Sequence, residues 1–278
     1  MDAEQTLNNA RIEGRHWWFA ARRRIVRVLL HDLIAPSQDV LVIDVGCGTG
    51  GNAGALSDEY LCVGIDASRE AVECATRLHP RARFIRGAVP RDLGALAGEA
   101  RVFLMMDVLE HVEDDFYLFS SVAAAAAPGS LFLITVPAHA DLWSAHDVAS
   151  RHYRRYESDR LTRVWAGLPF SQLLLSPFNA RLLPLVRTAR ALNNKLGRTS
   201  GDAGTDMRVP SAPVNAALRS VFAGEAGLLR RALRDGGTQA FADGVSLIAI
   251  LRREPGTIQP RTKPTDIPRD IHDPERTR

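Results

Sequence analysis

The chain has 278 residues, of which 46% are hydrophobic and 24% are charged, and its formal net charge is +3. A chain of this length buries a large core, so we expect one elaborated domain or one domain with a cap. Three cysteines without metal-ligand spacing argue against a disulfide framework. The sequence shows neither a signal peptide nor an apolar run near the ~18 residues of a membrane-spanning helix, so a cytoplasmic protein is expected.

Basic residues concentrate in one part of the chain. Residues 151–235 contain fifteen Arg and Lys against six Asp and Glu, and the rest of the chain has a net charge of −6. The excess of positive charge in this region indicates an anionic substrate or a membrane surface as a partner. In the alternative interpretation, the region is a solvated, arginine-rich helical face. The sequence patterns of nucleic-acid-binding modules are missing, so no nucleic-acid partner is expected.

The first part of the chain is predicted to be helical. Apolar residues recur at intervals of three or four across residues 8–35, and the pattern ends at Pro36. We therefore expect residues 1–36 to form a helical lid over the domain that follows.

Apolar runs typical of strands alternate with helical segments in residues 37–176, the expected core. The predicted strands are 40–45, 61–65, 83–86, 102–106, 131–136 and 171–175. The predicted helices are 51–59, 68–78 with Ser68 as N-cap, 115–127, and 158–166 with Ser158 as N-cap. This βαβ succession predicts an α/β protein with a doubly wound parallel sheet.

A long excursion precedes the last strand. Residues 177–240 contain four prolines and several apolar helical stretches, so we expect a helical cap over a binding site. The amphipathic stretch 173–196 either makes a peripheral membrane contact or packs on the domain. Residues 241–253 are expected to return as the final core strand, and residues 254–278, rich in Pro and charge, are expected to be disordered.

The loop after the first core strand predicts a nucleotide-like ligand. Glycines at positions 46, 48 and 50 allow close approach of the backbone, and a helix N-terminus follows. Gly46, Gly48 and Gly51 also satisfy the dinucleotide fingerprint, and a glycine turn that only packs a helix on a strand is a third interpretation. Asp44 disfavours a pyrophosphate and favours the cationic S-adenosylmethionine, which has no phosphate.

Two further groups of acidic residues end predicted strands. Asp66 follows the second strand and can accept both hydroxyls of a ribose, or it is an ordinary surface Asp. If a helical turn begins at Asp107, then Asp107, Glu110 and His111 lie on one face. Such a trio is a general-base cluster, a hard-metal site or a packed structural turn.

Together these motifs resemble class I S-adenosylmethionine-dependent methyltransferases. The resemblance rests on residues 42–50, 64–66 and 107–112, and it covers about residues 10–253. The chain is also similar to a bacterial subgroup that begins with a His-Trp-Trp-Phe element, here residues 16–19. The resemblance implies a Rossmann-like, mostly parallel seven-stranded sheet and S-adenosylmethionine as cofactor.

The resemblance also implies where the cofactor binds. The residues concerned are Trp17, Asp44, Gly46, Cys47, Gly48, Gly50, Asp66, Ala67, Ala88, Met106, Asp107 and His111. An acidic residue that often follows the third strand in this family is missing from residues 86–89, so backbone and apolar contacts are expected to hold the adenine. The trio at Asp107 resembles an element of quinone-ring O-methyltransferases for which a divalent ion is inferred, but no metal is predicted here.

Two segments are expected to flank the methyl-transfer site. One of Trp17 and Trp18 is expected to shield the sulfonium while the other packs in the lid. The candidate substrate-binding residues are Trp18, Trp143, Arg155 and Tyr156. In the alternative interpretation, basic residues such as Arg155 attach the lid to acidic positions such as Asp147.

The predicted reaction is methyl transfer to oxygen. His146, His111 or His152 could take a proton from a hydroxyl, with His146 favoured because it lies in the substrate-facing segment, whereas a carboxylate acceptor needs no base. The acceptor is expected to be a small molecule, a glycan or a lipid-linked compound. The alternatives are an NAD(P)-dependent oxidoreductase and a non-catalytic nucleotide-binding or membrane-surface protein.

Overall fold

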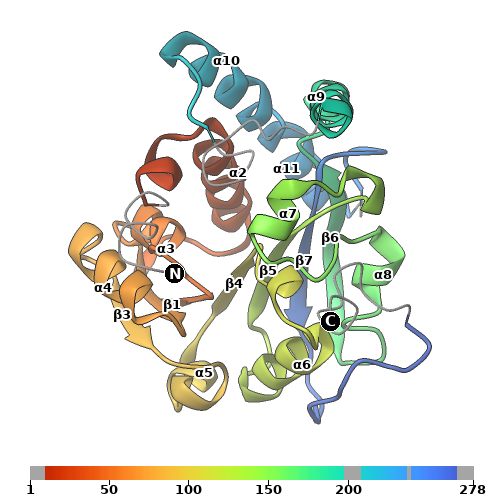
Figure 1. Cartoon of the computed structure of the whole chain (residues 1–278). Helices are drawn as coiled ribbons and strands as arrows, with labels where there is room; N and C mark the ends of the chain where they lie inside the picture. The colour runs from red at the N-terminus through yellow and green to blue at the C-terminus, as the bar shows by residue number, and fades with distance from the viewer. Residues whose placement is uncertain (1–9, 197–207, 237–238, 268–278) are drawn as a thin grey trace.

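The computed structural model describes residues 10–196, 208–236 and 239–267 (Figure 1). Seven strands form one sheet in the order β3-β2-β1-β4-β5-β7-β6. Only β7 runs antiparallel to its neighbours, β5 and β6. The strands are β1 Ser37–Val45, β2 Tyr60–Asp66, β3 Arg83–Arg86, β4 Val102–Met106, β5 Leu131–Pro137, β6 Phe170–Phe178 and β7 Ser246–Arg253. The expected seven-stranded, mostly parallel α/β fold is confirmed.

Helices cover both faces of this sheet. They are α2 Trp17–Leu33, α3 Gly51–Leu56, α4 Arg69–Leu78, α5 Leu96–Glu99, α6 Asp115–Ala125, α7 Ala145–Ala149, α8 Ser158–Thr162, α9 Leu183–Leu196, α10 Ala212–Ala223 and α11 Ala226–Arg234. Ser68 caps α4 as predicted, since its side chain accepts a hydrogen bond from the Ala71 N–H. Ser158 does not cap α8, because Glu157 precedes the first turn and Ser158 is already helical.

Alternating side chains of the strands build two hydrophobic cores. Ile43, Phe103 and Ile134 face α5, α6 and α8. Val42 and Leu104 point to the other face, which α2, α3, α10 and α11 cover. Asp44 follows Val42 on that second face, and its carboxylate therefore points toward α3.

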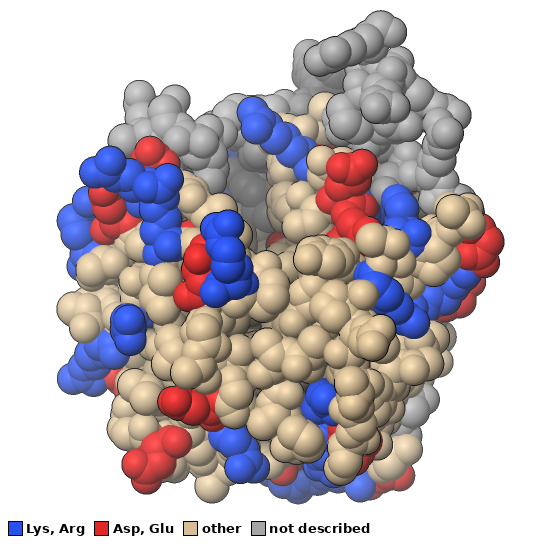
Figure 2. Space-filling view, turned by 90° about the horizontal axis from the view of Figure 1, so that it is seen from below, with Lys and Arg blue, Asp and Glu red and all other residues tan. Residues whose placement is uncertain are grey.

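The described residues of the excursion before β7 contain the helices α9, α10 and α11, and the first of these helices begins only at Leu183. Residues 173–178 belong to β6, where Leu174 pairs with Ile250 of β7, so the prediction of one amphipathic stretch over 173–196 is wrong for its first part. The helices α10 and α11 pack against α2. Figure 1 shows α9 and α10 along the upper border of the molecule. On the face turned away from them, acidic and basic side chains surround a mostly uncharged centre (Figure 2).

The segment after β7 is ordered up to residue 267, which corrects the prediction of a disordered tail. Ile258 and Ile267 are buried in the core beside α6 and α8. The Arg261 N–H donates to Ser120 Oγ at 2.9 Å, and Arg261 Nη2 donates to the carbonyl of Val164 at 3.0 Å. Residues 268–278 lie outside the described part of the chain.

Among the described residues, no helix combines the length and the apolar character needed to cross a membrane. The three cysteines, Cys47, Cys62 and Cys74, are buried and free. Their spacing in the sequence had predicted no disulfide framework.

The order of the strands places a crevice between β1 and β4. The connections from these two neighbouring strands lead to opposite sides of the sheet, and ligands of doubly wound folds bind beyond the carboxyl ends of such strands. The loop from Gly46 and the turn at Asp107 meet at this edge.

Candidate active site

The glycine loop has a backbone that only glycine adopts without strain. Gly46, Gly48 and Gly50 have φ values of 64°, 52° and 85°. A Cβ added at Gly50 would lie 2.7 Å from Cζ of Phe84, so a larger residue cannot replace it without displacing the ring. Gly46 and Gly50 are therefore required by the packing of the loop on Val108 and Phe84, whereas Gly48, where an added Cβ would meet nothing within 4 Å, is the position open to a ligand.

Asp44 lies under this loop with an incomplete set of partners. Its Oδ2 accepts a hydrogen bond from the Ala53 N–H of α3 at 3.2 Å, whereas its buried Oδ1 has no partner among the described residues. Burial raises the pKa of Asp44 to about 7, and the nearby Glu13 carboxylate adds to the shift. A buried carboxyl of this kind is ionised most easily when a cation binds beside it.

Asp66 is held in one orientation by two backbone groups. Its Oδ2 accepts from the Gly48 N–H at 2.9 Å and its Oδ1 from the Ser68 N–H at 2.8 Å. Each carboxylate oxygen retains a lone pair, so the side chain can still accept the two hydroxyls of a ribose.

An acidic side chain does lie beside the loop after β3. Asp92 Oδ2 accepts from the Ala88 N–H at 2.7 Å, and a Cβ at Gly87 would lie 2.5 Å from Cβ of Asp92. The hydrogen bond from Arg91 lowers the pKa of Asp92, and the bond from Ala88 adds to this shift. Residues 86–89 themselves contain no carboxylate, as noted from the sequence, but the turn that follows brings Asp92 beside them.

A buried ion pair joins α2 to the end of β4. Arg22 is 3% exposed and forms an ion pair with Asp107, while Thr135 Oγ1 donates to the other oxygen of Asp107 at 3.1 Å. Asp107 has a left-handed φ of 56°, and the 3-10 turn begins only at Leu109. The predicted helical turn starting at Asp107 is therefore wrong.

The two tryptophans of α2 have different surroundings. The guanidinium of Arg22 lies 4.4 Å from the ring centroid of Trp18, which places Trp18 beside Asp107. The ring of Trp17 packs on Phe222 of α10, with 6.1 Å between the centroids. Trp18 therefore lies beside the Arg22 and Asp107 pair, whereas Trp17 packs on α10, and the cofactor contact predicted for Trp17 stays a prediction.

The three candidate histidines come together from different segments. The ring centroid of His152 lies 4.6 Å from that of His111 and 6.0 Å from that of His146, both in edge-to-face arrangements. His111 is exposed, His146 is half-buried and His152 is buried. Although the residue as a whole is exposed, its ring packs on the buried His152, and the resulting desolvation lowers the pKa of His111; the charges of His152 and His146 lower it further.

Asp147 holds His152 in place. The fully buried Asp147 Oδ1 lies 2.9 Å from His152 Nδ1 and also accepts from Arg155 Nε at 2.9 Å. Burial opposes ionisation of Asp147, but the hydrogen bond to His152 and the charges of Arg155 and Arg190 together lower its pKa. A carboxylate on Nδ1 keeps the proton there and leaves Nε2 as the basic nitrogen of His152.

Glu110 is the most unusual carboxyl of the cluster. It is fully buried, and neither of its carboxylate oxygens has a hydrogen-bond partner among the described residues. Burial raises its pKa well above the ordinary value, and Asp107 adds to the shift. Atoms of Glu110, His111 and His152 that can bind a metal lie within 4.8 Å of one another. The group can therefore exchange protons or hold a divalent cation, and it differs from the trio considered from the sequence because His152 takes the place of Asp107.

Arg155 and Tyr156 belong to the framework of the segment rather than to its surface. Arg155 Nη1 donates to the carbonyl of Ala138 at 2.8 Å in addition to its bond to Asp147. Tyr156 is fully buried and donates to Asp115 Oδ2 at 2.9 Å. Both side chains are hydrogen-bonded within the protein, and the bond of Arg155 to Asp147 agrees with the alternative interpretation, while their role in substrate binding stays a prediction. Trp143 is half-buried just before α7.

The remaining predicted cofactor residues lie at the same edge of the sheet. Ala67 and Ala88 are exposed after β2 and β3, and Met106 is buried at the end of β4. The N–H of Cys47 donates to the carbonyl of Ile65 at 3.1 Å. These positions therefore follow the ends of strands that meet at one edge of the sheet, and their cofactor contacts stay predictions.

Glu13 lies beside the glycine loop, a contact that the sequence did not predict. Thr49 Oγ1 donates to its carboxylate, and a Cβ at Gly51 would lie 2.2 Å from Glu13 Oε1. A cavity of about 380 Å³ lined by Glu13, Thr49 and Gly51 opens here. The sequence around Glu13 contains no motif that predicts this contact, because Glu13 and Thr49 are 36 residues apart in the chain.

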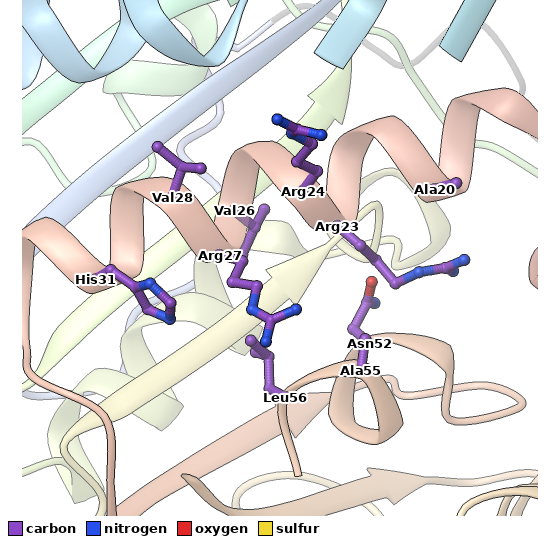
Figure 3. Close-up of a pocket in the computed structure, with 10 residues that line it drawn as sticks. All are labelled: Ala20, Arg23, Arg24, Val26, Arg27, Val28, His31, Asn52, Ala55 and Leu56. Atoms are coloured by element: carbon purple, nitrogen blue, oxygen red, sulfur yellow. The ribbon is translucent and has the colours of Figure 1, made fainter. Parts of the chain in front are cut away.

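A separate groove of about 450 Å³ runs between α2 and α3. Figure 3 shows Arg23, Arg27 and His31 of α2 along it, with Asn52 and Leu56 of α3 opposite. Arg27 Nε donates to Glu59 Oε1 at 2.9 Å. The groove includes none of Asp44, Asp66, Asp107 or the histidine cluster, so it is not the crevice described above.

Comparison with known proteins agrees with the geometry. A family model described as a methyltransferase domain matches residues 15–183. A ubiquinone biosynthesis O-methyltransferase of Vibrio campbellii is 34% identical over 135 residues, which are 43% of this chain and 57% of the relative. Norajmaline N-methyltransferase of Rauvolfia serpentina is 30% identical over 109 residues, which are 36% of this chain and 37% of the relative.

The chain thus spans 37% to 57% of the length of these two relatives. Among solved structures, the plantazolicin methyltransferase BamL superposes with a TM-score of 0.54 at 11% identity, covering 91% of both chains. The related structure of BpumL in complex with SAH has a TM-score of 0.50 at 15% identity and covers 89% of both chains. These likenesses show a shared fold.

Proposed function

Because the chain belongs to the methyltransferase domain family and is an S-adenosylmethionine-dependent enzyme, we propose that it methylates a hydroxyl oxygen of its acceptor. The acceptor would be a small molecule, a glycan or a lipid-linked compound. The observation that carries the proposal is the buried Asp147 and His152 pair, which supplies an oriented base beside the crevice.

The residues at the crevice fit the cofactor. Asp44 has an unpartnered buried oxygen for a cationic group, and the loop is open at Gly48, where an added Cβ would meet nothing within 4 Å. Asp66 would hold the ribose hydroxyls, and Asp92 is added as a candidate for the adenine amino group. When bound, S-adenosylmethionine supplies a methyl group on a positively charged sulfur, and no phosphate meets these carboxylates.

The protein would then position the acceptor and manage its proton. His152 Nε2 would take the proton of the hydroxyl, because Asp147 fixes the other ring nitrogen as the donor. Trp18 and Arg22 would close one side of the site and exclude water. The relatives named O-methyltransferases support an oxygen acceptor, whereas the relative named an N-methyltransferase makes nitrogen the rival acceptor atom.

The test uses S-adenosylmethionine labelled in its methyl group and a small-molecule and lipid extract as the source of acceptor. A labelled product that survives mild alkali as an ether supports the proposal. Methanol released by alkali would indicate a carboxylate acceptor, and an N-methylated product would indicate nitrogen; either outcome would contradict the proposal.

The base is tested in the same assay with His152→Gln. We expect kcat to fall at least about 100-fold while calorimetry shows unchanged cofactor binding. His31→Gln on α2, which lies outside the crevice, is the matched control and should keep full activity. Unchanged kcat in His152→Gln would refute the role of His152.

A further inference from the structure

The outer surface of α9, α10 and α11 differs from the rest of the molecule in charge. In the described residues 181–196 and 208–234 there are nine Arg and Lys and one acidic residue, Glu225. Glu225 is fully buried and accepts from the Asn179 N–H at 2.7 Å. Within these helices the exposed charges are therefore all positive, and an exposed acidic residue, Asp235, follows only at the C-cap of α11.

Exposed apolar side chains gather on the same helices. Of the ten large hydrophobic residues exposed in the described chain, five lie on these helices and a sixth, Val209, shortly precedes α10; the five are Leu185, Leu192, Val214, Val221 and Leu228. Leu185 and Leu192 are seven residues apart on α9, and Val214 and Val221 are seven apart on α10, so each pair occupies one helix face. Most of α10 is exposed, yet Arg219 is its only charged residue.

Some of these cations are neutralised within the protein and others are not. Arg230 and Arg234 form ion pairs with Asp32, at 2.9 Å and 2.6 Å. In the described structure, the exposed Lys195, Arg219 and Arg231 take part in no ion pair. The surface thus combines unneutralised positive charge with apolar side chains.

We propose that this cap surface, defined by Leu185, Leu192, Val214, Val221, Lys195, Arg219 and Arg231, docks on an anionic lipid bilayer. Apolar side chains on a helix enter the boundary between headgroups and acyl chains, and basic side chains are attracted to anionic headgroups. A large exposed apolar patch also suits a protein partner, but a surface whose exposed charges have one sign fits a uniformly anionic plane best. The opposite face, with its mixed charges, has no such complementarity (Figure 2).

The docked cap would bring the active site toward the bilayer. The helices α10 and α11 pack on α2, which contains Trp18 and Arg22, and Arg190 of α9 donates to the carbonyl of Leu142, close to α7. This placement gives a lipid-linked acceptor a short route to the crevice. The docking itself does not depend on the proposed acceptor, so it is measured without methyl transfer.

The test is co-sedimentation of the full chain with vesicles of phosphatidylcholine, with and without phosphatidylglycerol, at low and high salt. We expect binding only to the anionic vesicles and its loss at high salt. The double variant Leu185→Asp with Leu192→Asp should lower the bound fraction about tenfold, and Arg219→Glu with Arg231→Glu should do the same. Thermal melting confirms that each variant is folded.

Matched controls carry the same changes elsewhere on the surface. Leu61→Asp with Leu78→Asp alters two equally exposed leucines, and Arg77→Glu with Arg83→Glu alters two exposed arginines; both should bind like the unmodified chain. Equal binding to neutral vesicles, no binding at all, or an equal loss in the controls would overturn the proposal. Light scattering that shows Leu185→Asp with Leu192→Asp dissociating a dimer, with vesicle binding unchanged, would make this face a contact between copies and would overturn it as well.

Discussion

At the scale of single residues, the buried Asp44 carboxyl affects both the stability of the folded chain and its affinity for the cofactor. Its pKa in the folded chain is about 7, above the value of about 3.9 in an unfolded chain, so its contribution to stability is present at low pH and is lost as pH rises through 7. Below that pH the side chain is protonated and attracts a cation less. Cofactor affinity should therefore rise as pH passes from 6 to 8.

The variant Asp44→Asn separates these two effects. It should melt above the unmodified chain at pH 8, by roughly 2–4 °C for each kcal/mol recovered, because no charge is buried. Its affinity for S-adenosylmethionine should fall at least about tenfold, because a charged partner is lost. Melting curves and calorimetry at pH 6 and pH 8 check both results; unchanged affinity at pH 8 would show that Asp44 does not meet the cofactor's cation.

A variant of Glu110 and a chelator together distinguish a proton-exchanging site from a metal-binding site. If its buried carboxyl is protonated, Glu110→Gln should keep or raise the melting temperature, since both forms are neutral, and a chelator should leave kcat unchanged. Activity is measured before and after dialysis against the chelator. A loss that a divalent ion restores would instead assign metal to Glu110, His111 and His152.

The residues that the sequence predicted at the site are those whose position follows from local pattern. Asp44 and Asp66 end apolar strands, and the carboxyl ends of parallel strands must meet, so both were identifiable. Glu13, Arg22 and Asp92 were missed because each reaches the site through the tertiary packing of a helix or a turn. Such contacts leave no motif in the sequence, because the residues that form them are far apart in the chain; Arg22 and Asp107 are separated by 85 positions.

At the scale of elements, α2 is attached to the core by its buried arginine. Arg22→Ala leaves Asp107 without its cation and should cost about 3 kcal/mol of unfolding free energy. Arg24→Ala, which removes an exposed arginine of the same helix, should change stability by less than about 0.5 kcal/mol. Denaturant titration of both variants checks the difference, and equal small losses would mean that the ion pair contributes nothing.

The cap also holds the first turn of α2. Asn215 Oδ1 accepts from the Trp17 N–H at 2.9 Å, and Asn215 Nδ2 donates to the carbonyl of Arg15 at 2.9 Å. Asn215→Ala removes both bonds and should cost about 1 kcal/mol. The neighbouring Ser220→Ala, which alters an exposed position of α10, is the control. A loss no larger than in that control would show that the contact does not stabilise α2.

Strands and helices whose apolar residues recur with a clear period were predicted. The boundary between the apolar strand and the amphipathic helix within residues 173–196 was not placed correctly. Residues 173–178 are apolar enough for either state, and pairing with β7 makes them a strand. The helix begins only at Leu183, after the turn at Asn179 with its left-handed φ of 56°. Sheet pairing of this kind joins segments about 75 residues apart, and local periodicity carries no information about it.

At the scale of the whole molecule, the segment after β7 completes the core. Its low apolar content predicted disorder, but Ile258 and Ile267 are buried. Deletion of residues 254–278 should cost about 3 kcal/mol, because two isoleucine side chains become exposed or are lost. Deletion of residues 268–278 alone removes none of these contacts and should cost less than about 0.5 kcal/mol. Equal stability of the two truncated chains, measured by denaturant unfolding, would contradict the packing described.

The cofactor assignment is tested most directly by calorimetric titration of the full chain with S-adenosylmethionine and, separately, with NADH. We expect one S-adenosylmethionine to bind per chain and NADH to give no heat of binding. Asp44→Ala and Asp66→Ala should each abolish the S-adenosylmethionine signal, while Asp58→Ala, at an exposed acidic position, should leave it unchanged. Unchanged affinity in both crevice variants, or binding of NADH in place of S-adenosylmethionine, would contradict the account.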